Sequence, residues 1–548
     1  MSAAPLSPPP TSLARTLGDR RRWYLGLVLA LLPVGLMVSV LAQATSNAPA
    51  SDDYSSILPF LCDWQGPATL AERWTSLTGQ FYGHRIIFTK LVALADYRLF
   101  GSCHLVGLQM FSLTGWLVAV GALLGSVPAI RRDPWLALPV TLLLMHPQGY
   151  SSLLTAIGLC NLWVVAFVVL AMLGAASPRP AGWILSVFFA SLATMCFANG
   201  LLAFPTIALG LLLRCEFRRA AMLALAGALV WALYLHGYQA DMGSLSLREL
   251  IRKAAIMTGG FAALGSLPVS VALVVGSLVL LFAGVLLCVR RFRRELPAHM
   301  TFLLFCGLTV LMAARGRAGW VDSYMLQDRY RLYGLLLLAV GYLAAITLGA
   351  PWRRWIGLSA VTLAAIYCFF SYVTHLAPLW SSQAWYQATA LNGQIGVGFP
   401  HTTPANWQPA IVSLEQAAAA DVYHLPRLLS APDVATIQAL PTMAPTSAFA
   451  YKLQADGSVC GHYLIPIDQG PAPDFAVLVS PTRRVILPVV RLRAKVAELA
   501  QVRSLLAARF GFVLPGAVYQ SGLQSIYGLR RDAAGRLAVV SVTSQVFP

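Results

Sequence analysis

The chain has 548 residues, of which 58% are hydrophobic and only 11% are charged, and its mean hydropathy is +0.68. Because soluble domains carry about a quarter charged residues, this composition argues against a water-soluble enzyme. The net charge of +18 does not indicate a nucleic-acid partner, since the Lys and Arg residues mostly flank apolar runs instead of gathering on one soluble face.

Residues 1–22 are rich in Pro and Ser, and we expect them to form a disordered cytoplasmic tail. A cleaved signal peptide is not expected, because the apolar run after Arg22 spans about 21 residues, too long for the core of such a peptide. The sequence then predicts eleven membrane segments, at residues 23–43, 104–127, 134–146, 152–175, 182–198, 201–213, 220–236, 266–289, 299–313, 333–350 and 356–375.

The basic residues predict the orientation of these segments. Arg20 to Arg22 precede the first segment, which places the N-terminus in the cytoplasm under the positive-inside rule. With an odd number of segments, we expect a multi-pass membrane protein whose C-terminal region lies outside. Basic clusters return in every second loop, at residues 131–132, 179, 214–219, 290–295 and 352–354.

The apolar run at 182–213 is divided into two short helices. A single helix of that length would span about 48 Å, well beyond a hydrocarbon core of about 30 Å. Asn199 and Gly200, followed by Pro205, offer a break near the middle. Basic residues on both flanks require an even number of crossings.

Three external regions are longer than a helix connection needs, at residues 44–103, 237–265 and 314–332. The first contains an amphipathic stretch. In the second, the Leu and Ile spacing of SLRELIRKAAIMTGG suits a helix that lies in the membrane interface.

The composition changes after His375, where the long apolar runs end and Pro, Gly, Asn and Gln increase. We therefore expect an all-α polytopic membrane bundle at 23–375 and an external β-rich (α+β) domain at 376–548. Helices are expected near 412–424 and 494–508, and strands at 447–453, 474–480, 483–493 and 536–544.

Asp52 and Asp53 follow the first membrane segment by about nine residues and form the first candidate site. Adjacent carboxylates at a membrane surface could hold a divalent cation or serve as a general base. The alternative is a solvated loop start or a turn stabilised by an aspartate side chain.

A cationic cluster follows at His84, Arg85 and Lys90. Such a cluster beside an apolar stretch suits a lipid phosphate, because Arg binds phosphate oxygens in bidentate fashion. The alternative is that these cations pair with Glu72 and Asp96 or extend toward lipid headgroups.

A third group contains Arg315, Arg317, Arg329 and Arg331, with two aspartates at 322 and 328. Arginines on the external side run against the positive-inside bias, so an anionic ligand or internal ion pairs should hold them. Among nine cysteines without metal spacing, Cys62 and Cys103 are candidates for a disulfide in the first external loop.

The sequence resembles the GT-C superfamily of bacterial inner-membrane glycosyltransferases and their uncharacterised relatives. The resemblance lies in the acidic pair after the first membrane helix, the long first external loop and the bundle of about eleven helices. Gly83-His84-Arg85 resembles the second half of an Asn-Glu-His-Arg element in that loop, although Gly83 stands where the relatives carry an acid. Arg329-Tyr330 resembles an Arg-Tyr element before a late helix.

The resemblance implies transfer of a sugar from a polyprenyl-phosphate donor to an envelope glycan or lipid. Asp52 or Asp53 would then act as base or help hold a metal, and Arg85, Arg329 or Arg331 would steady the leaving phosphate. Two other functions stay open. One is an O-antigen-type polymerase or ligase, and the other is a non-enzymatic transporter or envelope scaffold.

Overall fold

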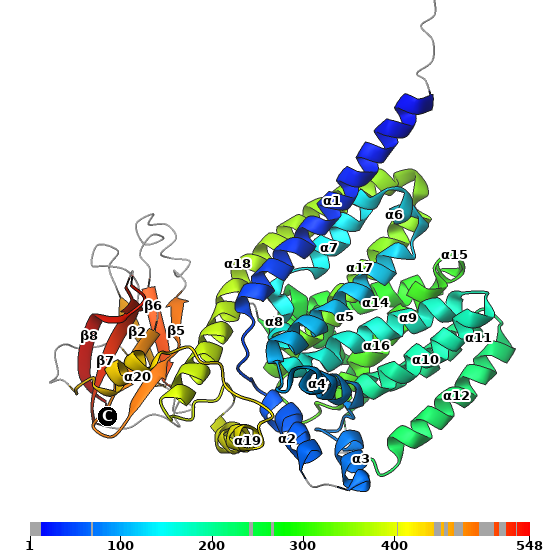
Figure 1. Cartoon of the computed structure of the whole chain (residues 1–548). Helices are drawn as coiled ribbons and strands as arrows, with labels where there is room; N and C mark the ends of the chain where they lie inside the picture. Colours follow the sequence, from blue (N-terminus) through cyan, green and yellow to red (C-terminus); the bar gives the residue numbers. More distant parts are fainter. Residues whose placement is uncertain are drawn as a thin grey trace, which may run out of the picture. The chain divides into compact units, whose positions relative to one another are not determined.

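The computed structural model describes residues 12–66, 69–239, 245–264, 268–402, 404–442, 451–453, 459–464, 475–492, 509–514, 522–532 and 534–547. The chain divides into two compact units, which are described separately (Figure 1). The helical unit contains residues 1–42, 114–149 and 162–372, and the mixed unit contains residues 43–113, 150–161 and 373–548.

Eight helices in the described parts of the chain are long and apolar enough to cross a membrane. Their length and composition are those of a polytopic helical membrane protein, as predicted. The eight spans are Arg20–Ala44, Leu105–Gly125, Ala156–Ala176, Phe217–Leu235, Val269–Cys288, Pro297–Arg315, Asp328–Leu348 and Ala350–Gln394.

The count of eleven membrane segments is not confirmed, because three of the predicted segments form shorter helices. The run at 182–213 breaks at Phe197, as expected, into α10 (Pro180–Cys196) and α11 (Ala203–Leu212), with a 3-10 turn η4 (Ala198–Leu202) between them. The segment at 134–146 contains only η1 (Pro134–Ala137) and α7 (Leu138–Leu144).

The ends of two long helices differ from the predicted boundaries. Helix α1 (Ser12–Ala44) begins at Ser12, whereas the predicted disordered tail extended through Arg22. Helix α18 (Arg353–Gln394) continues well past His375, and the two units divide within it, between Tyr372 and Val373.

Six further helices of the helical unit are spans from this set or parts of them: α5 (Leu105–Gly125), whose first part belongs to the mixed unit, α9 (Leu159–Ala176), α12 (Phe217–Leu235), α14 (Val269–Cys288), α16 (Pro297–Arg315) and α17 (Asp328–Leu348). The other elements of this unit are α6 (Pro128–Arg132), η2 (Pro147–Gly149), α13 (Leu247–Gly259), η5 (Gly260–Ala262), α15 (Arg290–Glu295), η6 (Asp322–Leu326) and η7 (Ala350–Trp352).

The expected interfacial helix at 237–265 is α13, and its second half is buried inside the helical unit. Leu247 and Ile251 are exposed, but Lys253 to Gly259 are buried. The burial depends on glycine: a Cβ on Gly276 of α14 would lie 1.8 Å from the carbonyl oxygen of Ala255. The helix therefore crosses α14 at close range and does not lie along a surface over its whole length.

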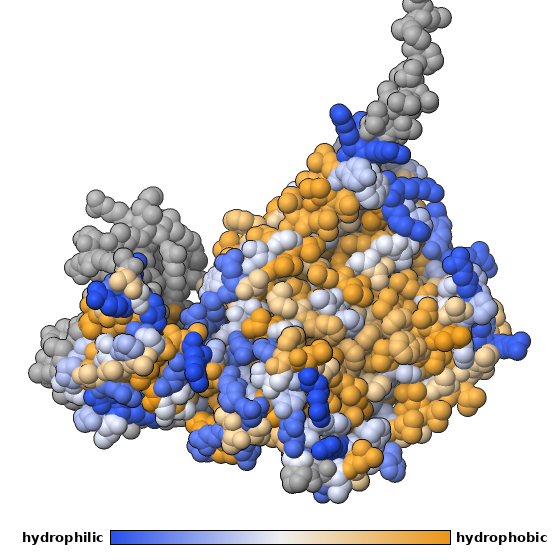
Figure 2. Space-filling model, viewed as in Figure 1, coloured by the Kyte–Doolittle hydropathy of each residue, from blue (hydrophilic) through white to orange (hydrophobic). Residues whose placement is uncertain are grey.

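The surface of the helical unit matches a lipid environment. Large apolar side chains are exposed along α1, α12, α14 and the first part of α18. On the face that Figure 2 shows, the surface of the helical unit is largely hydrophobic, and hydrophilic residues lie toward its two ends. Apolar side chains exposed in such numbers are stable in contact with lipid but not with water.

The mixed unit contains a helical layer formed by the segments between α1 and α5 and after α18. Ile57, Leu58 and Leu61 of α2 and Ala417 of α19 belong to one buried core, to which α3, α4 and η3 also contribute. Cys103 lies in this core and Cys62 packs against it, and both are free thiols, so these two candidates do not form a disulfide with each other. The helices are α2 (Asp53–Gln65), α3 (Leu70–Thr78), α4 (Ile87–Phe100), α8 (Tyr150–Leu154), η3 (Ala156–Gly158), η8 (Pro404–Asn406), α19 (Trp407–Ala419) and α20 (Ala431–Gln438).

Within the part of the chain that the structure describes, eight strands form two four-stranded antiparallel sheets, with strand orders β1-β2-β6-β5 and β4-β3-β7-β8. Both faces of the second sheet are covered: Leu478 contacts the core that includes Trp407, and Val477 contacts the core that includes Ile437 of α20. The strands are β1 (Tyr451–Leu453), β2 (Val459–Leu464), β3 (Phe475–Val479), β4 (Arg484–Leu487), β5 (Val489–Leu492), β6 (Arg509–Leu514), β7 (Gly522–Arg531) and β8 (Leu537–Phe547).

Most of the elements predicted after 376 are present. The strand at 474–480 is β3, the strand at 536–544 is part of β8, and the helix near 412–424 is α19, shifted toward the N-terminus. The single strand predicted at 483–493 is two strands in different sheets, because the chain changes sheets at Pro488. Part of the strand at 447–453 and the helix at 494–508 lie outside the described residues.

Candidate functional site

Asp53 is the most constrained carboxylate of the candidate site. Its side chain is fully buried. Its Oδ1 accepts a hydrogen bond from the amide of Ile157 at 2.8 Å, and its Oδ2 accepts from the amides of Ala50 and Ala156 at 3.2 and 3.3 Å. Asp53 therefore joins the start of α2 to η3, about a hundred residues later in the chain.

Burial dominates the ionisation of Asp53. It raises the pKa of the carboxyl to about 7, and the three amide hydrogen bonds oppose this shift without cancelling it. Because both oxygens are occupied by the backbone, Asp53 is suited to hold the loop in place and not to contact a substrate.

Asp52 occupies a different environment from its neighbour. It is the N-cap residue of α2 and is partly exposed. Its carbonyl oxygen accepts a hydrogen bond from the hydroxyl of Ser56 at 2.6 Å, which ties it to the first turn of the helix. Of the acidic pair, Asp52 is thus the residue whose carboxylate can meet a ligand.

His84 lies in a tight turn that accounts for the glycine before it. Phe81 and His84 exchange both backbone hydrogen bonds, and the two residues between them have positive φ, 44° at Tyr82 and 76° at Gly83. These dihedrals define a type I′ hairpin turn, whose second position strongly favours glycine. Gly83 is therefore a residue that this turn favours.

Arg85 and Lys90 both bind the C-terminal end of α3. Arg85 Nη1 donates to the carbonyl oxygen of Thr78 at 2.6 Å, and Lys90 Nζ donates to that of Ser76 at 2.6 Å. Lys90 is buried, its ammonium lies over the ring of Phe60, and burial lowers its pKa to about 8. Cations are stabilising at a helix C-terminus, so Lys90 acts as a cap here and not as an exposed phosphate ligand.

Arg329 and Arg331 belong to the helical unit, at the start of α17, whereas Asp52, Asp53, His84, Arg85 and Lys90 belong to the mixed unit. Arg329 Nη2 donates to Gln327 at 2.7 Å and its guanidinium lies over the ring of Tyr330. Its Nε is buried and has no hydrogen-bond partner among the described residues. Arg331 Nε donates to the carbonyl oxygen of Leu326 at 2.8 Å.

The arginines at 314–332 were predicted to be held by an anionic ligand or by internal ion pairs. Asp322 instead pairs with Arg252 of α13, a residue that the sequence analysis did not select. Arg317 donates to the hydroxyl of Tyr330 at 3.0 Å and its guanidinium lies over the ring of Trp320. Arg315 is exposed and takes part in no ion pair within the described chain.

Two further polar contacts in the helical unit tie its loops to its helices. Asn199 of η4 donates to the hydroxyl of Tyr333 of α17 at 2.7 Å, a hydrogen bond that ties the break between α10 and α11 to another helix. Gln148, which the sequence analysis did not select, donates to the carbonyl oxygen of Phe261 at 2.9 Å and accepts from the hydroxyl of Tyr367 at 2.5 Å.

The acidic pair does not fit a divalent cation that is held by the protein alone. Such ions take several oxygen ligands, and the oxygens of Asp53 already accept backbone amides. Over the described parts of the chain, no three His, Cys, Asp or Glu side chains are grouped closely enough to hold a metal ion. No family model and no curated protein matches this chain.

Proposed function

We propose that the chain is a membrane glycosyltransferase-like protein that transfers a sugar from a polyprenyl-phosphate donor to an envelope glycan or lipid. The observation that carries this proposal is the fixed position of Asp52. Asp53 accepts hydrogen bonds from three backbone amides, two of which belong to η3, and this fixes the start of α2. Asp52, the preceding residue, is therefore held in place and is partly exposed. A base held in one geometry before the substrate arrives lowers the cost of orientation in the transition state.

The proposed location is the external face of a bacterial inner membrane. The mixed unit contains the segments that follow α1, precede α5, precede α9 and follow the membrane part of α18. Connecting segments that pack together outside a membrane lie on the same side of it. The candidate base and the C-terminal sheets would then share the side opposite to the basic N-terminal tail, which the positive-inside rule puts in the cytoplasm.

This arrangement also bears on the number of crossings. The end of α5 and the start of α9 would lie on opposite sides, so the chain between them crosses once, although α7 is only seven residues long. A helix that short is tolerated in a membrane where neighbouring helices cover its ends. We therefore keep an odd number of crossings as part of the proposal.

The proposed reaction is a displacement at the anomeric carbon. Asp52 takes the proton of the acceptor hydroxyl, the acceptor oxygen bonds to the anomeric carbon, and the bond from that carbon to the phosphate oxygen breaks. The electron pair leaves with polyprenyl phosphate, whose negative charge is stabilised by fixed cations.

The proposal is tested in a deletion strain by analysis of its envelope glycans and glycolipids. We expect wild-type protein to restore a missing sugar and Asp52→Asn to fail at normal membrane abundance. Asp63→Asn is the matched control, because Asp63 is an exposed carboxylate of the same helix α2. Full restoration by Asp52→Asn would refute the proposed base.

A second candidate, a polymerase or ligase of the O-antigen type, is favoured by the arginines at 314–332. Asp322 pairs with Arg252, and within the described residues Arg315 and Arg317 have no acidic partner. Such an enzyme also uses lipid-linked glycans but does not need Asp52. If Arg315→Gln abolishes the glycan and Asp52→Asn does not, this second function replaces the first.

A further inference from the structure

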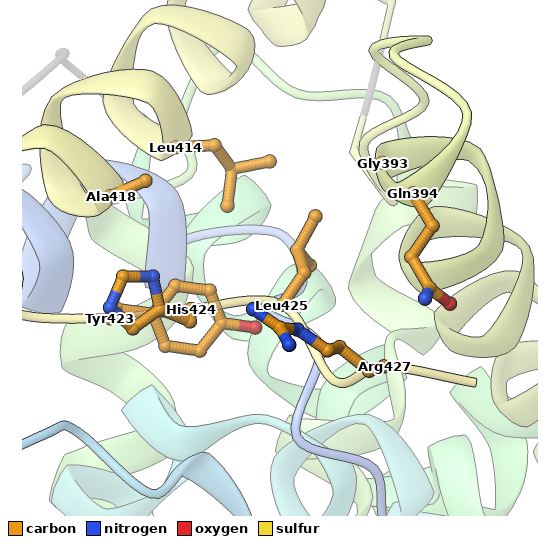
Figure 3. Close-up of a pocket in the computed structure, with 8 residues that line it drawn as sticks. All are labelled: Gly393, Gln394, Leu414, Ala418, Tyr423, His424, Leu425 and Arg427. Carbon is orange, nitrogen blue, oxygen red and sulfur yellow. The ribbon is translucent and has the colours of Figure 1, made fainter. Parts of the chain in front are cut away.

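A cavity of about 390 Å³ lies in the mixed unit between the end of α18, α19 and the loop after α19 (Figure 3). In Figure 3, Leu414 and Ala418 of α19 form one wall, and His424, Leu425 and Arg427 of the loop form the opposite one. Cavities of this size accept ring-sized organic ligands, whereas a bare inorganic anion would leave most of the volume to water. None of these residues belongs to the site proposed above.

The loop wall is fixed by contacts with α18. The side-chain oxygen of Gln394 accepts from the amides of Leu428 and Leu429 at 2.6 and 2.8 Å, and its nitrogen donates to the carbonyl oxygen of Leu429 at 3.1 Å. A Cβ at position 393 would lie 2.3 Å from Leu425, so Gly393 lets the loop approach the helix. The cavity is therefore held open by contacts that do not depend on a ligand.

Arg427 brings a positive charge to the cavity without an internal counter-ion. It is exposed, and it forms no ion pair or hydrogen bond with any residue that the structure describes. An arginine in this state can pair with a carboxylate or phosphate in bidentate fashion.

His424 adds an acceptor beside this cation. Its Nε2 lies 2.7 Å from Oδ1 of Asp421. A carboxylate oxygen only accepts hydrogen bonds, so the ring nitrogen is the donor. In the neutral imidazole, this bond puts the proton on Nε2 and leaves Nδ1 as an acceptor. A ligand that satisfies both residues carries an anionic group for Arg427 and a hydroxyl for His424.

We propose that this cavity binds an acidic monosaccharide unit such as a hexuronic acid, with its carboxylate on Arg427 and a hydroxyl donating to His424. The apolar walls formed by Leu414 and Leu425 suit the C–H faces of a sugar ring. The proposal does not depend on the transfer chemistry assigned to Asp52, because it concerns binding alone.

The test measures binding of glucuronic acid to the purified full-length protein in detergent, with glucose and inorganic phosphate as comparison probes. We expect glucuronic acid to bind more tightly than either. Arg427→Gln should weaken its binding by about tenfold or more, because one charge-assisted contact is lost. Arg98→Gln is the matched control, since Arg98 is an exposed arginine of α4 outside the cavity and has no partner among the described residues.

A second variant tests the cavity without changing charge. Ala418 is exposed on α19, so Ala418→Phe can fill the space without disturbing the core. Loss of glucuronic acid binding in both Ala418→Phe and Arg427→Gln, with Arg98→Gln unchanged, supports the site. Equal binding of glucose or phosphate, or glucuronic acid binding that survives Ala418→Phe, would overturn it.

Discussion

The side-chain amide of Asn392 forms two hydrogen bonds with the backbone of Ile486. Its nitrogen donates to the carbonyl oxygen of Ile486 at 2.6 Å, and its oxygen accepts from the amide of the same residue at 2.8 Å. Ile486 lies in β4, an edge strand of its sheet. Asn392 on α18 thus takes the place of a neighbouring strand and ties the second sheet to the helix.

Replacing Asn392 should loosen this sheet. In Asn392→Leu, the amide and carbonyl of Ile486 would stay buried without partners, and each buried group left unsatisfied costs about 1–3 kcal/mol. We expect a lower melting temperature and faster proteolysis within 475–547. Gln387→Leu, at an exposed position of the same helix, is the control and should leave both unchanged. Equal stability of the two variants would show that the Asn392 contacts contribute little.

The pairing of Asn392 with Ile486 could not be predicted from sequence. The apolar runs predict helices because helix periodicity is a property of neighbouring residues. Asn392 and Ile486 are 94 positions apart, and a single polar residue near the end of a helix contains no information on its distant partner. The same holds for Asp53. The sequence shows that it follows an apolar helix, but not that its carboxylate accepts hydrogen bonds from the amides of residues 156 and 157.

Segment boundaries were mispredicted where local patterns conflict. Helix α18 continues to Gln394 although apolar character declines after His375, because the later turns are buried against the second sheet and need no lipid. Pro488 separates β4 from β5 inside one apolar stretch, and the hydrophobicity of that stretch does not reveal the change of sheet.

The close contact of α13 with α14 should tolerate no side chain at position 276. Gly276→Val would bring its Cβ against the carbonyl oxygen of Ala255, and overpacking of this kind costs about 1–3 kcal/mol or more. We expect a lower unfolding temperature in detergent. Gly284→Val is the matched control, because Gly284 lies on the same helix and has no atom within 4 Å of its Cβ position. If the two variants unfold at the same temperature, the helices are not as close as described.

Asp53 and His401 should give opposite pH dependences of stability. Burial raises the pKa of Asp53 to about 7, so the folded state retains a proton that the unfolded chain loses, and the free energy of unfolding falls as pH rises from about 4 to about 7. Burial lowers the pKa of His401 to about 4, so its contribution rises with pH between about 4 and 6.5. The two effects oppose each other in the wild type.

Single substitutions should expose each effect. In Asp53→Asn the His401 effect remains, and the melting temperature should rise more steeply with pH between about 4.5 and 6.5 than in the wild type. In His401→Gln it should rise less steeply or fall over the same interval. Melting temperatures at four pH values suffice, with Asp63→Asn as the control. Parallel profiles in all four proteins would contradict both assignments.

The two adjacent aspartates should separate stability from activity. Asp52→Asn removes a partly exposed carboxylate, so the melting temperature should stay within about 1 °C of the wild type, since surface changes usually cost less than about 0.5 kcal/mol. If Asp52 is the base, sugar transfer should fall about a hundredfold or more. Asp53→Asn instead puts an amide group against backbone amides at 50, 156 and 157, so its melting temperature should fall. Assays of the purified variants with a polyprenyl-phosphate sugar would distinguish the two roles. If the Asp53→Asn protein is as stable as the wild type but inactive, Asp53 is the catalytic base, because a displaced loop could not then explain the loss of activity.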